Sequence, residues 1–142
     1  MHGFWRWGIG RLMRIYGHSM MPTLAPGALV FVGDGAFVSR QPQHGEIVAA
    51  APTALGGKPF VKRIVGLPSE RVTIGEQSWQ LEENQFFLMG DQVEHSMDSR
   101  IFGPVSREEL IGPVRLRLWP WKVFHTESNK EVEINGKTVA VS

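Results

Sequence analysis

The stretch Phe60-Val61-Lys62-Arg63-Ile64-Val65-Gly66 decides the fold class of this chain. It is short, apolar apart from two adjacent cations, and closed by glycine, which is typical of a buried β-strand. Alternation along a strand places Lys62 on the same face as Phe60 and Ile64, so its amine is expected to enter an apolar cleft. Burial disfavours an ammonium and lowers its pKa. The alternative is an ordinary strand lysine whose amine reaches water.

Segments with the same period of two recur on both sides of this stretch. Strands are expected at residues 28–32, 46–50, 71–74, 78–81, 85–89 and 111–119, and a hairpin is expected at 131–141. Asn135-Gly136 suits the hairpin turn, and Gly112-Pro113 indicates a bulge or an edge. Outside the N-terminal segment, the pattern offers one helical turn, with Ser106 as N-cap and Glu109 three residues later. The prediction is a mostly β fold, a folded-over sheet or partly closed barrel with minimal helix.

Length and composition exclude several classes of function. The 142 residues suffice for one domain, and 42% of them are apolar, enough to bury a core. A net charge of +1 argues against nucleic acid as a partner. The chain has no cysteine, which excludes a disulfide scaffold, a thiol nucleophile and a cysteine-built zinc site. With no cluster of metal ligands visible, we expect no metal and no cofactor.

Residues 1–16 form an N-terminal segment that we expect to be distinct from a domain at 17–142. At 100° per residue its large apolar side chains fall within one arc, with the arginines outside it. The arc contains Trp5, Ile9, Leu12, Met13 and Tyr16, and the arginines are Arg6, Arg11 and Arg14. Such a segment could lie on an anionic membrane surface, or it could pack as a helix on its own core and give way to a strand near Leu12. Neither a spanning helix nor a signal peptide is expected.

A second stretch, Gly17-His18-Ser19-Met20-Met21-Pro22-Thr23, has the character of a nucleophile loop. Pro22 stiffens the turn, and Gly17 permits a close approach of another backbone. A serine hydroxyl attacks an amide only when a base lies within hydrogen-bond reach. His18 is poorly placed as that base because adjacent strand residues point to opposite faces. The base could instead be another histidine or a lysine, and Lys62 is the lysine that stands apart from the others.

The other histidines give no catalytic pattern. They stand in polar or loop contexts with no acidic partner at a suggestive spacing, so we expect solvated side chains. These histidines are His44, His95 and His125.

A third constellation follows the strand at 85–89: Gly90-Asp91, and then Ser96-Met97-Asp98-Ser99-Arg100. Asp98 and Arg100 are two residues apart and could brace a loop through a charge-assisted pair. Ser96 would share their face and could hydrogen-bond a neutral amine. The alternative is a simple polar turn.

These three motifs, in this order, resemble those of the bacterial type I signal peptidases, the Ser/Lys endopeptidases of family S26. The resemblance extends over residues 16–120. It implies an all-β catalytic domain at the outer face of the cytoplasmic membrane. It also implies that the substrates are exported preproteins, whose signal peptides are cut after small residues at positions −3 and −1. No cofactor or nucleic acid is implied.

The resemblance also implies roles for individual residues. Ser19 would be the nucleophile and Lys62 the general base. Ser96 would orient the amine, Asp98 and Arg100 would support the site, and Met20 would help to line the substrate cleft. These roles fall on matching motif positions.

The chain departs from the family pattern in several places. Gly17 stands where many members carry a serine that assists the oxyanion, and only 18 residues precede Ser19, where the family normally has a spanning helix. The stretch between Gly66 and Phe87 is also short, so the accessory β region is expected to be minimal.

Other functions stay open on the sequence alone. One is a specialised maturation protease for a single precursor, of the pilin or metalloenzyme type, with the same Ser/Lys chemistry. A self-cleaving repressor is disfavoured because no helix-turn-helix motif precedes Ser19. A non-catalytic β module that binds peptides is disfavoured by the combination of Ser19, Lys62 and Ser96.

Overall fold

The structure is a computed structural model that describes residues 5–7, 10–124, 131–134 and 137–141. Its first strands are β1 (Trp5–Trp7), β2 (Gly10–Arg14), β3 (Leu29–Val32), β4 (Ile47–Ala50), β5 (Phe60–Gly66), β6 (Arg71–Ile74) and β7 (Gln77–Gln80). The later ones are β8 (Gln85–Met89), β9 (Val105–Ser106), β10 (Leu110–Trp119), β11 (Trp121–Val123), β12 (Glu131–Ile134) and β13 (Lys137–Val141). The helices are short: α1 (Ser99–Phe102) and the 3-10 turns η1 (Ala36–Val38), η2 (Thr53–Leu55), η3 (Val93–His95) and η4 (Arg107–Glu109).

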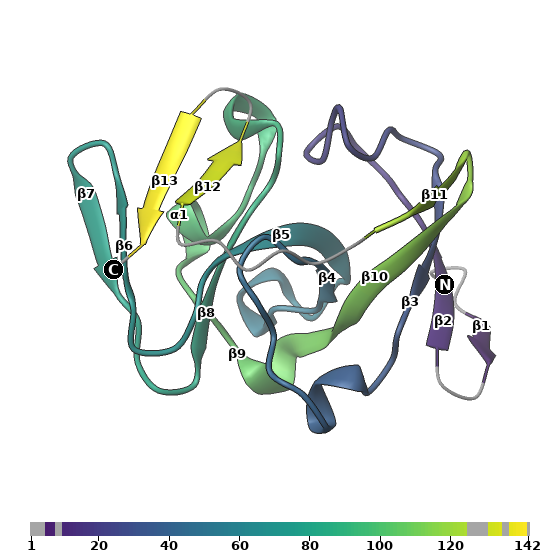
Figure 1. Ribbon diagram of the computed structural model, residues 1–142, viewed down its shortest axis with the longest axis horizontal. Helices are drawn as coiled ribbons and strands as arrows, with labels where there is room; N and C mark the ends of the chain where they lie inside the picture. Colours follow the sequence, from purple (N-terminus) through teal and green to yellow (C-terminus); the bar gives the residue numbers. More distant parts are fainter. Residues whose placement is uncertain (1–4, 8–9, 125–130, 135–136, 142) are drawn as a thin grey trace.

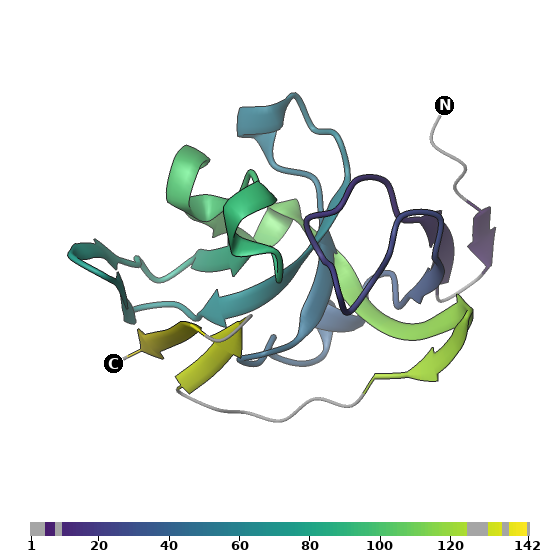
Figure 2. The same cartoon turned by 90° about the horizontal axis from the view of Figure 1, so that it is seen from above.

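The larger sheet curls into a half-barrel, as the sequence predicts. Its strand order is β1-β2-β3-β10-β4-β5-β8-β9, with β11 also paired to β10. The long strand β10 pairs with β4 at one end and with β3 at the other, so it carries the sheet around the bend (Figures 1 and 2). The expected bulge is present as a register shift between Leu110 and Gly112. A Cβ on Gly112 would lie 2.0 Å from the carbonyl oxygen of Gly33, so this crossing requires glycine.

A smaller sheet, β12-β13-β6-β7, covers one end of the molecule (Figure 1). The hairpin β6–β7 is nearly all that the chain inserts between Gly66 and Phe87, which agrees with a minimal accessory region. The hairpin expected at 131–141 is confirmed by the antiparallel pairing of β12 and β13. Its turn, Asn135-Gly136, lies outside the described residues.

The N-terminal segment forms strands where the structure describes it, so the helix predicted from its 100° apolar periodicity was wrong. Strands β1 and β2 pair antiparallel with Trp5 opposite Leu12, and β2 continues into pairing with β3. The strand expected near Leu12 is therefore confirmed. Met13 is buried whereas Tyr16 is 79% exposed, so the residues of the arc do not share one face. The glycine of β2 gives the reason: a Cβ on Gly10 would lie 2.1 Å from the Phe31 ring, so close packing of two strands decides this region.

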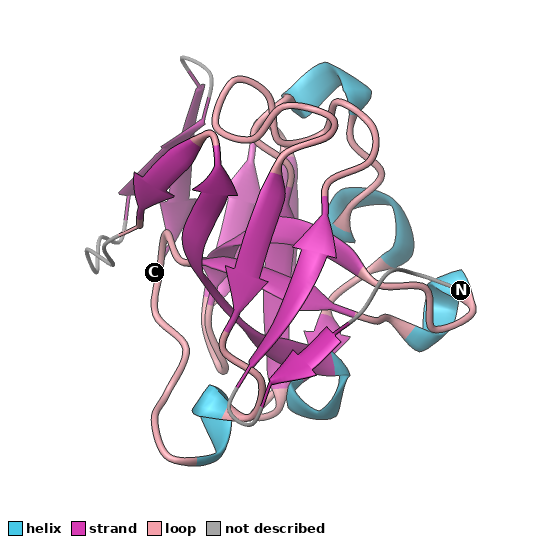
Figure 3. Cartoon of the chain, turned by 90° about the vertical axis from the view of Figure 1, so that its right-hand side faces the viewer, coloured by secondary structure: helices cyan, strands magenta, loops and turns pink. Residues whose placement is uncertain are grey.

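Of the helical turns, η4 is confirmed with the full Ser106–Glu109 capping box, but η1, η2, η3 and α1 were not predicted. Figure 3 shows these short helices at the ends of strands and in the loops. In the described part of the chain, no helix has the length and apolar character needed to cross a membrane.

Two apolar clusters fix the position of the strand that carries Lys62. One cluster includes Ile47, Ala49 and Val61, and the other includes Val48 and Ile64. Since β4 and β5 contribute to both clusters, the middle of β5 is held on both faces. Lys62 therefore projects from a rigid strand.

Candidate active site

Ser19 lies in the long loop between β2 and β3, and backbone hydrogen bonds hold that loop. The amide of Gln92 donates to the carbonyl of Ser19 at 2.8 Å, which ties the loop to the segment after β8. Within the loop, the amide of Leu24 donates to the carbonyl of Met20, also at 2.8 Å. Gly17 has φ +77° and open space where a Cβ would stand, so its backbone conformation calls for glycine. The serine side chain is thus presented on a fixed turn.

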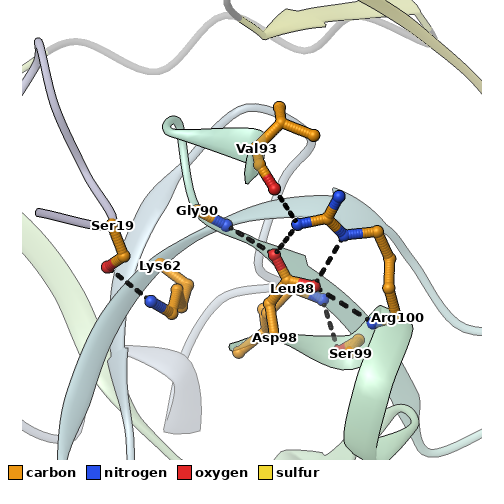
Figure 4. Close-up of polar contacts among 8 residues, drawn as sticks. All are labelled: Ser19, Lys62, Leu88, Gly90, Val93, Asp98, Ser99 and Arg100. Atoms are coloured by element: carbon orange, nitrogen blue, oxygen red, sulfur yellow. Dashed lines mark hydrogen bonds and ion pairs between the residues drawn. The ribbon is translucent and has the colours of Figure 1, made fainter. Parts of the chain in front are cut away.

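The amine of Lys62 meets this hydroxyl. Lys62 Nζ donates to Ser19 Oγ at 2.5 Å, and the residue is only 4% exposed (Figure 4). The ring of Phe60 lies 5.2 Å from the amine, on the same side of the strand, as alternation predicts. Burial lowers the pKa of Lys62 to about 8, against a smaller raising effect of the Asp98 charge and a further lowering by Arg100. A substantial fraction of the amine is therefore neutral in mildly alkaline solution.

Asp98 and Arg100 form the pair that their spacing suggested. Arg100 donates to both carboxylate oxygens, from Nε at 2.9 Å and from Nη2 at 2.8 Å. The backbone amides of Gly90 and Arg100 add hydrogen bonds at 3.1 Å each. Asp98 is fully buried and is the N-cap of α1, whereas the sequence suggested a turn or strand at this point. Arg100 also donates to the carbonyl of Val93 at 2.8 Å (Figure 4).

Ser96 is buried beside the loop that carries Ser19, but it makes no hydrogen bond to Lys62. Its Oγ is a buried atom for which the structure gives no hydrogen-bond partner. A Cβ on Gly90 would lie 2.2 Å from this Oγ and 2.6 Å from the carbonyl oxygen of Ser19, so Ser96 packs next to the Ser19 backbone. Gly90 is thus required at the contact between these two segments. The orienting role of Ser96 stays a prediction.

A second carboxylate network beside Ser19 and Lys62 was not predicted from the sequence. Asp91 accepts from Arg63 Nε at 2.8 Å and Nη2 at 2.7 Å, and from the Thr23 hydroxyl at 2.5 Å. Arg63 also donates to the carbonyl of Gly45 at 2.6 Å. Thr23, Arg63 and Asp91 each stand in one of the three motifs. The presence of a charged or hydroxyl side chain in every motif is the signal that could have indicated the network. It joins the serine loop, β5 and the end of β8.

A cleft of about 130 Å³ opens beside Ser19 and Lys62. One wall is residues 13–16, which continue β2, and the other is residues 59–62, which begin β5. Met20 lines the cleft as well, in agreement with the role implied for it. A larger hollow of about 630 Å³, formed by parts of 35–41 and 107–111, is lined by none of the predicted site residues.

His44 contradicts the expectation of solvated histidines without acidic partners. It is 4% exposed, and its Nε2 lies 2.7 Å from Glu70 Oε1, which also accepts from the amide of Leu67. The spacing of 26 residues hides this pair in the sequence, because the fold brings the two loops together. The side chain of His95 and the whole of His125 lie outside the described residues. Among the residues searched, no group of three or more metal-ligating side chains is present.

The sequence of this chain matches a known protein family. A model of the signal peptidases of peptidase family S26 matches residues 3–78 and 75–119, well over half of the chain. The chain belongs to the S26 signal peptidase family. Both Ser19 and Lys62, and the carboxylate networks around them, lie within the matched residues.

Individual relatives come from bacteria and from mitochondria. A probable signal peptidase I-2 of Synechocystis is 32% identical over 130 residues, covering 72% of this chain and 60% of the relative. The mitochondrial ATP-independent inner membrane protease subunit 1b of Arabidopsis thaliana is 30% identical over 125 residues, covering 82% of this chain and 74% of the relative. A mitochondrial inner membrane protease subunit 1 of Schizosaccharomyces pombe is 32% identical over 111 residues, covering 73% of this chain and 70% of the relative. The chain thus spans 60% of the length of the Synechocystis relative, which is less than two thirds.

Proposed function

We propose that this chain is a serine endopeptidase that removes signal peptides from exported preproteins, using Ser19 and Lys62 as a catalytic dyad. The observation that carries the proposal is the 2.5 Å contact between the Ser19 hydroxyl and a buried amine whose pKa is lowered to about 8. A buried, partly neutral amine in contact with a hydroxyl is suited to act as its general base. Membership of the S26 family supports the same reaction.

The reaction follows from these two groups. Neutral Lys62 accepts the Oγ proton as Ser19 attacks the carbonyl carbon of the residue at −1. The resulting ammonium then protonates the leaving amine, and an acyl-enzyme remains on Ser19. Lys62, neutral again, takes a proton from water as the water oxygen attacks the ester carbonyl carbon. The Lys62 ammonium then returns the proton to Ser19 Oγ as the ester bond breaks and the cleaved signal peptide is released. No step calls for a cofactor.

The surrounding residues have supporting roles in this proposal. The oxyanion is bound by the backbone amide of Ser19, with a second donor near Gly17. Asp98 and Arg100 hold the segment after β8 against the dyad, through the hydrogen bonds to Gly90 and Val93. Ser96 is the third group in this proposal and would orient the Lys62 amine; its buried Oγ, which has no hydrogen-bond partner in the structure, supports that role.

The cleft is suited to an extended peptide with small side chains. Ile15 directs its amide and carbonyl toward the β3 side, where they pair with Ala28 and Gly27 at 2.8 Å. Since the hydrogen-bonding groups of successive strand residues point to alternate edges, Arg14 and Tyr16 direct theirs to the other edge. A substrate strand can pair there by β-augmentation. A volume of about 130 Å³ accommodates small side chains at −1 and −3.

We further propose that the chain works at the outer face of a membrane, with the cleft near the lipid. Trp119 and Trp121 are 66% and 67% exposed on the β10–β11 hairpin. That hairpin lies beside the serine loop, and Arg117 Nη1 of β10 donates to the carbonyl of Thr23 at 3.1 Å (Figure 1). Tryptophan favours membrane interfaces because one part of its ring is apolar and one is polar. The relatives from mitochondria are likewise named for the inner membrane.

The central test is cleavage of a panel of signal-peptide substrates, with the cut sites identified by mass spectrometry. Ser19→Ala and Lys62→Ala are each expected to abolish cleavage, by more than about 10³-fold, while circular dichroism stays native. His18→Ala is the matched control and is expected to keep most of the activity. Cleavage that persists in either dyad variant would overturn the proposal, and cutting of a single precursor only would indicate a dedicated maturation protease.

Membrane attachment is tested by sedimentation with phosphatidylglycerol vesicles. Binding is expected at low salt, and Trp119→Ser with Trp121→Ser is expected to weaken it several-fold, because aromatic burial is lost. Replacing Trp5 and Trp7 with serine tests the N-terminal segment separately. Salt should weaken only the part contributed by arginines. Wild-type protein that stays in the supernatant at every salt concentration would contradict attachment through this chain.

A further inference from the structure

Arg14 is the feature of the cleft that the proposed chemistry does not use. It stands on the wall formed by residues 13–16, and Arg14 and Lys62 are the charged residues that line the cleft, with no carboxylate among the lining residues. Arg14 is exposed, and Nη1 donates to the carbonyl of Gly27 at 2.9 Å, a neutral partner. Within the described residues, no carboxylate forms an ion pair with it. Its positive charge is therefore not neutralised by an ion pair with any described residue.

Strand geometry determines which substrate side chains meet Arg14. Met13 and Ile15 are 7% and 6% exposed, so they face inward, and Arg14 and Tyr16 face outward. When an extended peptide pairs with this edge, its side chains alternate in the same way. If small residues at −1 and −3 point into the cleft, the residues at −2 and −4 lie on the outward face. That face carries the guanidinium of Arg14.

We propose that Arg14 selects for substrate charge, favouring an acidic over a basic side chain at the outward position −2. This inference rests on the proposed endopeptidase activity and adds a charge preference to it. Opposite charges on neighbouring strands attract and like charges repel, each by an amount that changes binding about two- to fivefold at an exposed site.

The experiment compares three peptides that differ only at −2, carrying Glu, Gln or Lys. Rates are measured at pH 9, where the amine of Lys62 is mostly neutral and a nearby substrate charge has little effect on its protonation. For wild-type enzyme we expect kcat/KM to be about fivefold or more higher for the Glu peptide than for the Lys peptide. Raising the salt concentration should shrink this ratio.

Variants at Arg14 provide the decisive readout. Arg14→Gln is expected to bring the Glu-to-Lys ratio close to one, and Arg14→Glu to invert it, each normalised to the same variant's rate on the Gln peptide. Arg115→Gln, an exposed arginine of β10 that does not line the cleft, is the control and should keep the wild-type ratio. A merely structural role of Arg14 would change all three rates together.

The outcomes separate this inference from the proposed function. If wild-type enzyme cuts none of the peptides, the proposed activity fails. If it cuts them with a ratio near one, or if Arg14→Glu leaves the ratio unchanged, the activity stands and the inference about Arg14 is overturned.

Discussion

Asp98 and Lys62 are two buried charged residues of the same site, and they differ in how many partners compensate their charges. Asp98 is fully buried and accepts hydrogen bonds from two backbone amides and two guanidinium nitrogens. Lys62 is 4% exposed and donates to one hydroxyl, that of Ser19, with no ion pair to any described residue. The carboxylate is therefore compensated, whereas the ammonium is not.

The difference in compensation distinguishes a structural role for Asp98 from the proposed catalytic role of Lys62. A buried charge that is fully hydrogen-bonded rigidifies its surroundings, which suits Asp98 as a brace that holds the loop after β8. An uncompensated buried cation is destabilised relative to its neutral form, which suits Lys62 as a base. Asp91, which is paired with Arg63 and bonded to Thr23, belongs with Asp98. In this site the ammonium of Lys62 is therefore destabilised by burial, whereas the carboxylates of Asp98 and Asp91 are paired and hold the surrounding segments in place.

The largest effect is expected from removing the compensated charge. Asp98→Ala leaves the amide of Gly90 and the buried part of Arg100 without their acceptor, and breaking such a pair costs about 3–5 kcal/mol. Unfolding in urea, followed by tryptophan fluorescence, measures the loss. The double variant Asp98→Ala with Arg100→Met is the control and should recover part of it, since no uncompensated cation remains. A loss below about 1 kcal/mol would show that Asp98 is not a brace.

The sequence was most informative where the signal is local. The bounds of β5 were predicted to the residue, because an apolar run closed by glycine and proline leaves little choice. The Asp98–Arg100 pair is also local, two residues apart. The same logic failed for α1, whose four residues are too short to show a helical period. It also failed for the helix expected in the N-terminal segment, because the packing of Gly10 against the Phe31 ring exists only after folding.

Contacts between distant segments could not be derived from spacing. Thr23, Arg63 and Asp91 are separated by 28 to 68 residues and meet only when the serine loop, β5 and β8 are assembled. His44 and Glu70 form another such pair. The neighbourhood of Ser19 and Lys62 was inferred by resemblance to a family, and the 43 residues between them give no geometric hint of it. Spacing predicts the elements of this site, but the fold is needed to assemble them.

An intermediate effect of opposite sign is expected at Lys62. Lowering its pKa from 10.5 to about 8 costs roughly 3 kcal/mol in the charged form, so Lys62→Met should stabilise the fold at pH 7 by about 1–3 kcal/mol while abolishing activity. The folded pKa lies below the unfolded one, so between pH 8 and 10.5 the unfolded chain binds more protons. Wild-type stability therefore rises with pH in that window, and the advantage of Lys62→Met shrinks.

Urea unfolding of both proteins at pH 7 and pH 10 measures this difference. Lys58→Met, at an exposed lysine of the same chain, is the matched control and should change stability little at either pH. A Lys62→Met variant that is less stable than wild type at pH 7 would mean that the ammonium is compensated after all.

The smallest effect is expected on the pKa of Lys62, through the charges of Asp98 and Arg100. For wild-type enzyme, kcat/KM should rise with pH through about 8, because only the neutral amine accepts the Ser19 proton. The positive charge of Arg100 lowers the pKa of Lys62, so Arg100→Gln should raise that pKa and move the rise to higher pH. Since Arg100 is not the main cause, the displacement should be below about one pH unit, or 1.4 kcal/mol.

Asp98→Asn sharpens this last measurement because the charge of Asp98 acts in the opposite direction. That carboxylate raises the pKa of Lys62, so neutralising it should move the rise in kcat/KM to lower pH. A general loss of rigidity in either variant would lower the rate at all pH values without moving the profile. Displacements in opposite directions would therefore show that the brace also adjusts the base electrostatically, and two unmoved profiles would confine Asp98 and Arg100 to holding the loop.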